Sequence, residues 1–344
     1  MKLCPFRKAN PFNPSDGTWL WATASPYNAV GNGTNDDTAE IQACINAAAS
    51  AGKGVYFPAG TYLIGSSLNL ASGVNLRGAS RDTTEITMGA KASPTLMLVA
   101  TNITGMAISD LLISGSAPTG NEYGMASTGS TYITLERMRF DDLRFGLKVG
   151  AGTNCTHWTV DDFLSRNCRM PICLSNLQDS TFRNLDSAAY NDGGASMTDH
   201  NLYIEAYVNR VLFEDVLFTD NGGYCMQFWS DGGLTSDITF RRMTLDARGD
   251  AKSGGCLAIG WAIEDITFED LTMYAKTNAP AIYWGGGTRV VMTDVAIPSG
   301  GWVYEVAGGD DPSACSMSGT YHVSYSMSTG GTLTGVNVSQ MVAN

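Results

Sequence analysis

The sequence predicts an all-β solenoid, a β-helix, in which one short strand unit recurs along the chain. A five-residue pattern of alternating apolar residues recurs every 24 to 31 residues, and its central residues are Leu147, Ile172, Leu202, Met226, Leu257 and Ile282. A second strand pattern, of the type Val211-Leu-Phe-Glu-Asp-Val, follows each of these units. Strands with a two-residue period and no helical stretches between them favour a β-helix over a leucine-rich or ankyrin array. The unequal intervals predict outer loops of unequal length.

Length, composition and charge narrow the choice further. A solenoid grows in one dimension, so 344 residues indicate one elongated domain, and 44% hydrophobic residues suffice for a continuous core. The net charge of −12 argues against nucleic acid or an anionic membrane as a partner. It also argues against a strongly anionic polymer unless a local basic patch overrides the field. No apolar run approaches the roughly 18–20 residues that a membrane span needs, so no membrane insertion is expected.

The two ends of the chain differ in composition from its middle. Residues 1–27 are rich in proline, asparagine and aromatic residues and are predicted to form a leader or attachment segment. Their basic residues are not followed by an apolar region, so an intact signal peptide is not expected. Residues 28–310 are assigned to the solenoid. Residues 311–344 keep some alternation and predict a last coil or β-extension, in which His322 is expected to be structural.

Eight cysteines lack the paired spacing of a zinc site, so no metal centre is expected from them. Cys225 and Cys256 occupy the same position of successive repeats, about 4.8 Å apart if the coils stack. A disulfide between them is one alternative, but cysteines on neighbouring in-register strands are more often free thiols that fill space in the core. Reduced cysteines suit synthesis in a cytoplasm.

Residues 37–50 are predicted to form a helix that covers one end of the solenoid. Asp37 and Glu40 resemble a capping box, and Gly52 is suited to end the helix. The predicted apolar face comprises Ile41, Cys44, Ile45 and Ala48. An open solenoid end exposes apolar core and unpaired strand edges, so an amphipathic helix is needed there.

The segment around this helix carries a family resemblance. The pattern G-x-G-T-x-D-D-T-x-x-I-Q, followed by G-x-V-x-F-P-x-G-x-Y, resembles the opening of the pectate-lyase-like right-handed β-helix superfamily. The matching residues are Gly31, Gly33, Thr34, Asp36, Asp37, Thr38, Ile41, Gln42, Gly54, Val55, Phe57, Pro58, Gly60 and Tyr62. That superfamily includes polysaccharide lyases, glycoside hydrolases, epimerases and bacteriophage tailspike proteins. Because Asp36 and Asp37 lie at the predicted helix, they are expected to be structural.

The resemblance implies a single-stranded right-handed parallel β-helix of about ten coils with an N-terminal capping helix. It implies a carbohydrate-directed protein with a polysaccharide as its partner, found on a virion or secreted outside the cell. A tail-associated protein of this kind is expected to be a homotrimer, and otherwise a monomer.

Aligning the repeats predicts which side chains share the outer face of the first strand. One row reads Lys148, Cys173, Tyr203, Gln227, Ala258 and Tyr283, and the next reads Gly150, Ser175, Glu205, Trp229, Gly260 and Gly285. The residues expected at the rims of this face are Asp199, His200, Tyr224 and Asp231. Aromatic rings beside carboxylates suit a sugar-binding groove, with Trp229, Gln227, Tyr283, Tyr224 and Lys148 as substrate-binding candidates.

Two reactions fit this face, and hydrolysis is favoured. Glu205 and Asp231 are predicted to lie near 8 Å apart, within the range for an inverting glycosidase, and Asp199 could replace Asp231. A polysaccharide lyase needs a base, for which His200 with Tyr203 could serve, and a neutraliser of the uronate, for which Lys148 or a calcium ion could serve. Neither row holds an arginine, which counts against the lyase. No other cofactor is expected.

A non-enzymatic alternative also stands. In a tail or adhesin protein the aromatic face would be buried between subunits. Trp284 falls on an inward position and is expected in the core. The recurring Asp and Asn residues between the strand patterns fit turns better than a metal-binding ladder. They are Asp110, Asp161, Asn184, Asp215, Asp265 and Asp294.

Overall fold

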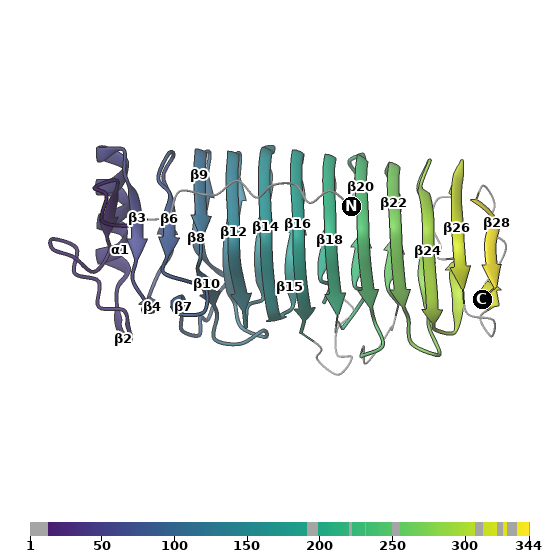
Figure 1. Cartoon of the computed structure of the whole chain (residues 1–344), viewed down its shortest axis with the longest axis horizontal. Coiled ribbons are helices and arrows are strands. Elements are labelled where there is room, and N and C mark those ends of the chain that lie inside the picture. Colours follow the sequence, from purple (N-terminus) through teal and green to yellow (C-terminus); the bar gives the residue numbers. More distant parts are fainter. Residues whose placement is uncertain are drawn as a thin grey trace.

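The computed structural model is an elongated stack of coils whose strands run side by side along its length (Figure 1). It describes residues 13–190, 199–219, 222–230, 232–249, 255–306, 312–321, 326–328 and 336–343. Strands of successive coils pair in parallel, in one sheet of 17 strands and another of 11. The prediction of an all-β parallel solenoid of about ten turns is therefore confirmed.

Short strands form the smaller sheet, one from each coil. They are β5 (Leu68–Asn69), β8 (Thr95–Thr101), β11 (Glu122–Thr128), β13 (Phe145–Val149), β15 (Met170–Leu174), β17 (Leu202–Ile204), β19 (Met226–Phe228), β21 (Leu257–Ile259), β23 (Pro280–Trp284), β25 (Trp302–Val306) and β27 (Ser326–Ser328). Their residues Leu147, Ile172, Leu202, Met226, Leu257 and Ile282 align across the coils and are fully buried.

The larger sheet contains the longer strands. They are β1 (Trp19–Trp21), β2 (Asn32–Asp36), β3 (Gly54–Phe57), β4 (Gly60–Ile64), β6 (Leu76–Gly78), β7 (Thr84–Met88), β9 (Thr104–Ser109), β10 (Leu112–Ser114), β12 (Thr131–Asp141), β14 (Cys155–Cys168), β16 (Leu177–Ala189), β18 (Asn209–Thr219), β20 (Thr235–Asp246), β22 (Ile263–Tyr274), β24 (Val291–Ser299), β26 (Cys315–Tyr321) and β28 (Val336–Ala343).

A column of left-handed residues bends the long strands at one level. Its members have φ between 51° and 60° and are Asp110, Arg137, Asp162, Asn184, Asp215, Arg242, Asp270 and Asp294. Such values are uncommon outside glycine, and aspartate and asparagine tolerate them best. Four predicted turn positions, Asp110, Asn184, Asp215 and Asp294, lie in this column. At Asp161 the bend falls on Asp162, and Asp265 has a left-handed backbone (φ 54°) at another level of its strand. Instead of bonding only to backbone, these side chains also pair between coils, as Arg242 does with Asp215 at 2.7 Å.

The interior is a continuous stack of apolar side chains. Four phenylalanines at equivalent positions, Phe182, Phe213, Phe240 and Phe268, stack with ring centroids 5.0, 4.7 and 4.8 Å apart. Each is fully buried, and so is Trp284, as its inward position predicted. The seven described cysteines are buried free thiols, which confirms the free-thiol interpretation for Cys225 and Cys256.

The helix α1 (Thr38–Ala51) lies at one end of the stack (Figure 1). Its buried residues are Ile41, Cys44, Ile45 and Ala48, and Gly52 ends it with a φ of 62°. The predicted capping box was wrong, because the Asp37 side chain makes no cap hydrogen bond. Its carboxylate accepts the backbone N–H groups of Val30 and Gly31 at 2.6 and 2.9 Å, and so anchors the preceding loop.

Strands are also present near both ends of the described chain. β1 pairs with β3, and β26 and β28 extend the larger sheet at the opposite end. His322 lies outside the described residues. Among the helices that the structure describes, none is long and apolar enough to cross a membrane.

Replacing Phe213 by alanine is expected to lower the free energy of unfolding by about 3–5 kcal/mol, because it opens a cavity between two stacked rings. Leu217 lies on the same strand but is 40% exposed, so Leu217→Ala should change stability by no more than about 0.5 kcal/mol. Urea unfolding monitored by circular dichroism measures both values. Equal effects of the two substitutions would contradict the inferred core.

Candidate functional site

The outer face of the smaller sheet, from β11 to β25, is the candidate site and is called the site wall below. Strand pairing places the predicted row on it in order: Lys148, Cys173, Tyr203, Gln227, Ala258 and Tyr283. The same row continues to Glu305 on β25. Residues that are far apart in the chain thus become neighbours on one surface, as the repeat alignment predicted.

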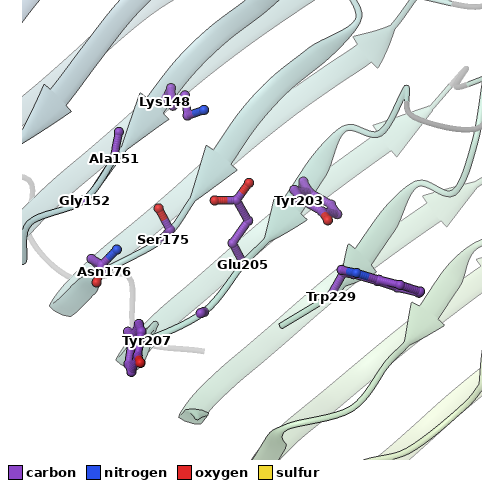
Figure 2. A pocket seen from close by; sticks show the side chains of 10 residues that line it. Lys148, Ala151, Gly152, Ser175, Asn176, Tyr203, Glu205, Tyr207 and Trp229 are labelled. Atoms are coloured by element: carbon purple, nitrogen blue, oxygen red, sulfur yellow. The ribbon is translucent and has the colours of Figure 1, made fainter. Parts of the chain in front are cut away.

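The second predicted row lies beside the first. Backbone N–H groups of Glu205, Trp229 and Gly260 donate to carbonyls of the preceding coil at 2.8, 3.0 and 3.2 Å, which keeps these positions in register beyond the strand ends. Figure 2 shows Lys148, Tyr203, Glu205 and Trp229 around one hollow. Its volume is about 360 Å³. This central hollow brings a cation, a carboxylate, a phenol and an indole together.

Cys173 lies beneath the Glu205 carboxylate and is almost fully buried. Its thiol donates a weak hydrogen bond to Glu205 Oε1 at 3.8 Å. Burial, with the nearby Glu205 charge, raises the pKa of this thiol to about 12. Cys173 is therefore a protonated support for Glu205 and not a nucleophile.

His200 lies under the site wall between two tyrosines. Its ring stacks with those of Tyr203 and Tyr224, with centroids 5.7 and 6.0 Å apart. Nδ1 is 3.0 Å from the backbone N–H of Tyr224 and 3.1 Å from its carbonyl oxygen. Each neutral tautomer therefore has a partner at Nδ1, and Nε2 can lose or gain a proton without leaving Nδ1 unsatisfied.

The structure corrects the predicted rim. Asp199 is fully buried, and His200 and Tyr224 are only 2% and 9% exposed. Asp199 occupies the position in its coil that Arg169 occupies in the preceding coil. The two side chains form an ion pair, with Arg169 Nη2 2.8 Å from Asp199 Oδ1. This ion pair removes Asp199 from the exposed position that a hydrolytic carboxylate needs. Asp231 lies outside the described residues.

Two arginines beside the site wall were missed. Arg144 and Arg169 each precede a strand of the site wall, and with Phe145, Met170 and Asp199 they line a hollow of about 220 Å³. The repeat alignment carries the signal, since Arg144, Arg169 and Asp199 are each three residues before a central apolar residue of the strand. The alignment was confined to the strand itself and so left this column out.

Arg144 differs from the other arginines in the described part of the chain. Every other one has a carboxylate within 4.0 Å. Arg144 instead contacts the Asn121 amide oxygen at 3.4 Å and the Tyr123 ring. Lys148, at the other end of β13, also has no ion pair within the described residues, and its ammonium lies 5.2 Å from the Phe145 ring centroid. Two uncompensated cations therefore flank one strand of the site wall.

The remaining predicted substrate-binding residues surround a second hollow further along the site wall. Tyr224, Gln227, Trp229 and Tyr283 line it together with Trp261, and its volume is about 110 Å³. Within the ranges described, no group of three or more His, Cys, Asp and Glu side chains is arranged to hold a metal ion.

Comparison with known proteins identifies the fold. The family model described as rhamnogalacturonase A/epimerase, pectate lyase-like, matches residues 21–107, the segment that carries the sequence motif. The A-module of mannuronan C-5 epimerase AlgE6 from Azotobacter vinelandii superposes with a TM-score of 0.71 at 16% identity. That likeness covers 94% of this chain and 99% of the module. The chain has the pectate-lyase-like right-handed β-helix fold.

Other β-helix structures are similar over most of the chain. The Dettilon tailspike protein has a TM-score of 0.62 at 13% identity, over 95% of this chain and 68% of the tailspike. The endo-xylogalacturonan hydrolase of Aspergillus tubingensis has a TM-score of 0.58 at 13% identity, over 92% and 98%. No curated protein matches by sequence. At these identities the structural similarity establishes the β-helix fold, and the reaction has to be inferred from the residues of the site.

The buried His200 should make stability depend on pH. Burial lowers its pKa from 6.5 to about 4, so between these values the unfolded chain binds a proton that the folded chain does not. Stability contributed by the neutral ring should therefore fall by about 3 kcal/mol as the pH drops from 6.5 to 4. Comparing the unfolding free energies of wild type and His200→Gln across this range isolates the effect. Parallel pH profiles for the two proteins would show that His200 is not held neutral.

Proposed function

We propose that this β-helix binds a uronate-containing polysaccharide along the site wall and abstracts a proton from the carbon that bears the uronate carboxyl. Polysaccharide lyases and uronate epimerases share this step. The observation that carries the proposal is the pair of cations without an ion pair among the described residues, Arg144 and Lys148, on the same wall as Tyr203, which stacks on the buried His200 two coils away.

The charge distribution supports an anionic substrate. The chain has a net charge of −12, and on the other walls arginines are neutralised by carboxylates of neighbouring coils. Arg144 and Lys148 are four positions apart, roughly 13 Å along an extended strand. A sugar carboxylate between them would gain two charge-assisted contacts without first breaking an ion pair. Such a local basic patch is what an acidic protein needs to hold a polyanion.

Candidate proton carriers lie two coils further along the site wall, at Tyr203 and the buried His200 beneath it. Abstraction of a proton beside a carboxylate needs a neutral base, an acid for the opposite step, and positive charge for the enolate-like intermediate. His200 is neutral at pH 7 because burial lowers its pKa. Tyr203 stacks on it and lines the central hollow, and its phenol is the proposed second proton carrier. Arg144 and Lys148 supply the positive charge.

Hydrolysis has less support. It needs two carboxyls about 5–9.5 Å apart across the scissile bond. Glu205 lines the central hollow, but Asp199 is buried against Arg169. The pairing of Glu205 with Asp231 stays a prediction. Among the structural neighbours, the mannuronan C-5 epimerase module supports the proton-abstraction proposal, and the xylogalacturonan hydrolase supports polysaccharide as the substrate class.

The wider biological setting is part of the same proposal. Resemblance to a tailspike and to a hydrolase of a polysaccharide favours a location outside the producing cell, on a virion or free. A trimer is proposed only for the virion-associated case. In either setting α1 would act as the cap of the first coil, since its buried residues continue the core at that end of the stack.

Removing the uncompensated cation should reduce turnover. Arg144→Gln is expected to slow exchange of the uronate C5 proton with deuterated water about 100-fold, because one contact to the developing negative charge is lost. The measurement is NMR of polymannuronate and polygalacturonate after incubation, which detects both lyase and epimerase products. Arg289→Gln, at an ion-paired arginine of the larger sheet, is the matched control and should keep full activity.

A different product would decide against the proposal. Hydrolysis releases reducing ends with no C5 exchange and no unsaturated uronate, and it would be abolished by Glu205→Gln. That combination would establish Glu205 as a catalytic carboxylate and would contradict proton abstraction by His200 and Tyr203.

A further inference from the structure

We propose that the second hollow of the site wall is a subsite for an uncharged sugar residue, so that the substrate is a heteropolysaccharide in which uronates and neutral sugars are combined. This inference rests on the proposed function, since it assumes that the same chain binds its uronate near Arg144 and Lys148. It adds a requirement on the composition of the polymer that neither the fold nor the reaction implies.

The hollow is an aromatic slot with a backbone floor. Trp229 and Trp261 contact each other with ring centroids 4.3 Å apart at 56°. Tyr224 and Tyr283 meet edge to face at 5.1 Å. Gly260 follows Trp229 on the row of the next coil, and a Cβ there would lie 2.7 Å from the Phe228 carbonyl oxygen. A glycine is therefore needed where the two backbones approach closely, and it adds no side chain to the lining of the slot.

Among the residues that the structure describes, the lining of the slot contains no charged side chain. Gln227 is the one amide among rings, aliphatic side chains and glycines, and the tyrosine hydroxyls complete the polar groups. Ring faces next to a few hydrogen-bonding groups suit the apolar face and the hydroxyls of a neutral pyranose. A carboxylate placed there would lose water without gaining a cation, which is costly.

The next coil adds a repulsive element. Glu305 follows Tyr283 on the first row, and burial together with the Glu305 charge raises the pKa of Tyr283. Glu305 has no ion pair within the described residues, so its field is uncompensated at this end of the site wall. The site wall is therefore cationic near β13 and anionic beyond β23, which selects against a uronate in the slot.

One polysaccharide chain can occupy both subsites, because the two hollows adjoin each other on the site wall. Four coil steps separate the row position of Lys148 from that of Ala258 beneath the slot, or roughly 19 Å at strand spacing. Trp229 lines both the central hollow and the slot, so the two are contiguous. A polysaccharide lying along the coils would therefore have its uronate and its stacked neutral residue several sugar units apart.

The test is binding of two hexasaccharides to the intact chain, measured by isothermal titration calorimetry. One consists of mannuronate alone, and the other alternates glucuronate with N-acetylglucosamine. Wild type is expected to bind the alternating oligosaccharide at least tenfold more tightly than the mannuronate hexamer.

Trp261→Ala should remove this preference. It should weaken binding of the alternating oligosaccharide about tenfold and change binding of the mannuronate hexamer less than twofold. Trp261→Phe keeps a ring and should retain most of the preference, while Tyr132→Ala, an exposed ring on the larger sheet, should change nothing.

Each other outcome is decisive. Equal or tighter binding of the mannuronate hexamer by wild type, or equal loss for both oligosaccharides in Trp261→Ala, would overturn the neutral subsite and leave the proposed function standing. Failure of wild type to bind either oligosaccharide would overturn both. A change of oligomeric state in Trp261→Ala, seen by light scattering with no change in binding, would assign the aromatic slot to a subunit interface and overturn the neutral subsite.

Discussion

The parallel hydrogen bonds between successive coils are the constraint on which the rest of the molecule depends. They hold equivalent residues about 4.8 Å apart and so convert a spacing of 24 to 31 residues in the chain into a column on the surface. A slip of one residue would exchange the buried Leu202 and Ile204 for Tyr203, and would destroy core and site together. The stacked phenylalanines hold this register from the inside, because Phe213 and Phe240 each pack between two other phenylalanine rings.

The left-handed residues of the long strands hold the register from the outside, and their ion pairs also determine the electrostatic field of the molecule. At positions with positive φ, arginines of one coil pair with aspartates of the coil before, as in Arg210 with Asp179 and Arg289 with Asp265. Each such exposed pair adds little to stability. Their combined effect on charge is larger, because they neutralise most of the arginines of an acidic protein within the stack. Among the described arginines, only Arg144 has no carboxylate partner, and it stands with Lys148 on the site wall, where the two can contact a polyanion.

The repeat alignment was sufficient to predict the fold, both rows of the site wall and the inward position of Trp284. It could not predict the burial of Asp199 or His200, because both lie in the corner before the strand, where side-chain direction no longer alternates with a period of two. The same corner conceals Arg169, whose pairing with Asp199 depends on the path of two loops. Asp37 was misassigned for a related reason: a carboxylate before a helix can cap it or bind the preceding loop, and only the loop conformation decides.

The burial of His200 keeps its ring uncharged at neutral pH. An exposed imidazole would be partly charged near its ordinary pKa of 6.5 and would compete with Arg144 and Lys148 for the substrate carboxylate by adding a third cation. Burial keeps the ring neutral, and the Tyr224 backbone satisfies Nδ1 in either tautomer. Binding and proton transfer are thereby assigned to different groups, with permanent cations holding the carboxylate and a neutral ring available for the proton. Because the remaining charge of the protein is negative, substrate attraction is short-ranged, within a Debye length of about 8–10 Å, and recognition depends on contact with these two cations and not on the field of the whole molecule.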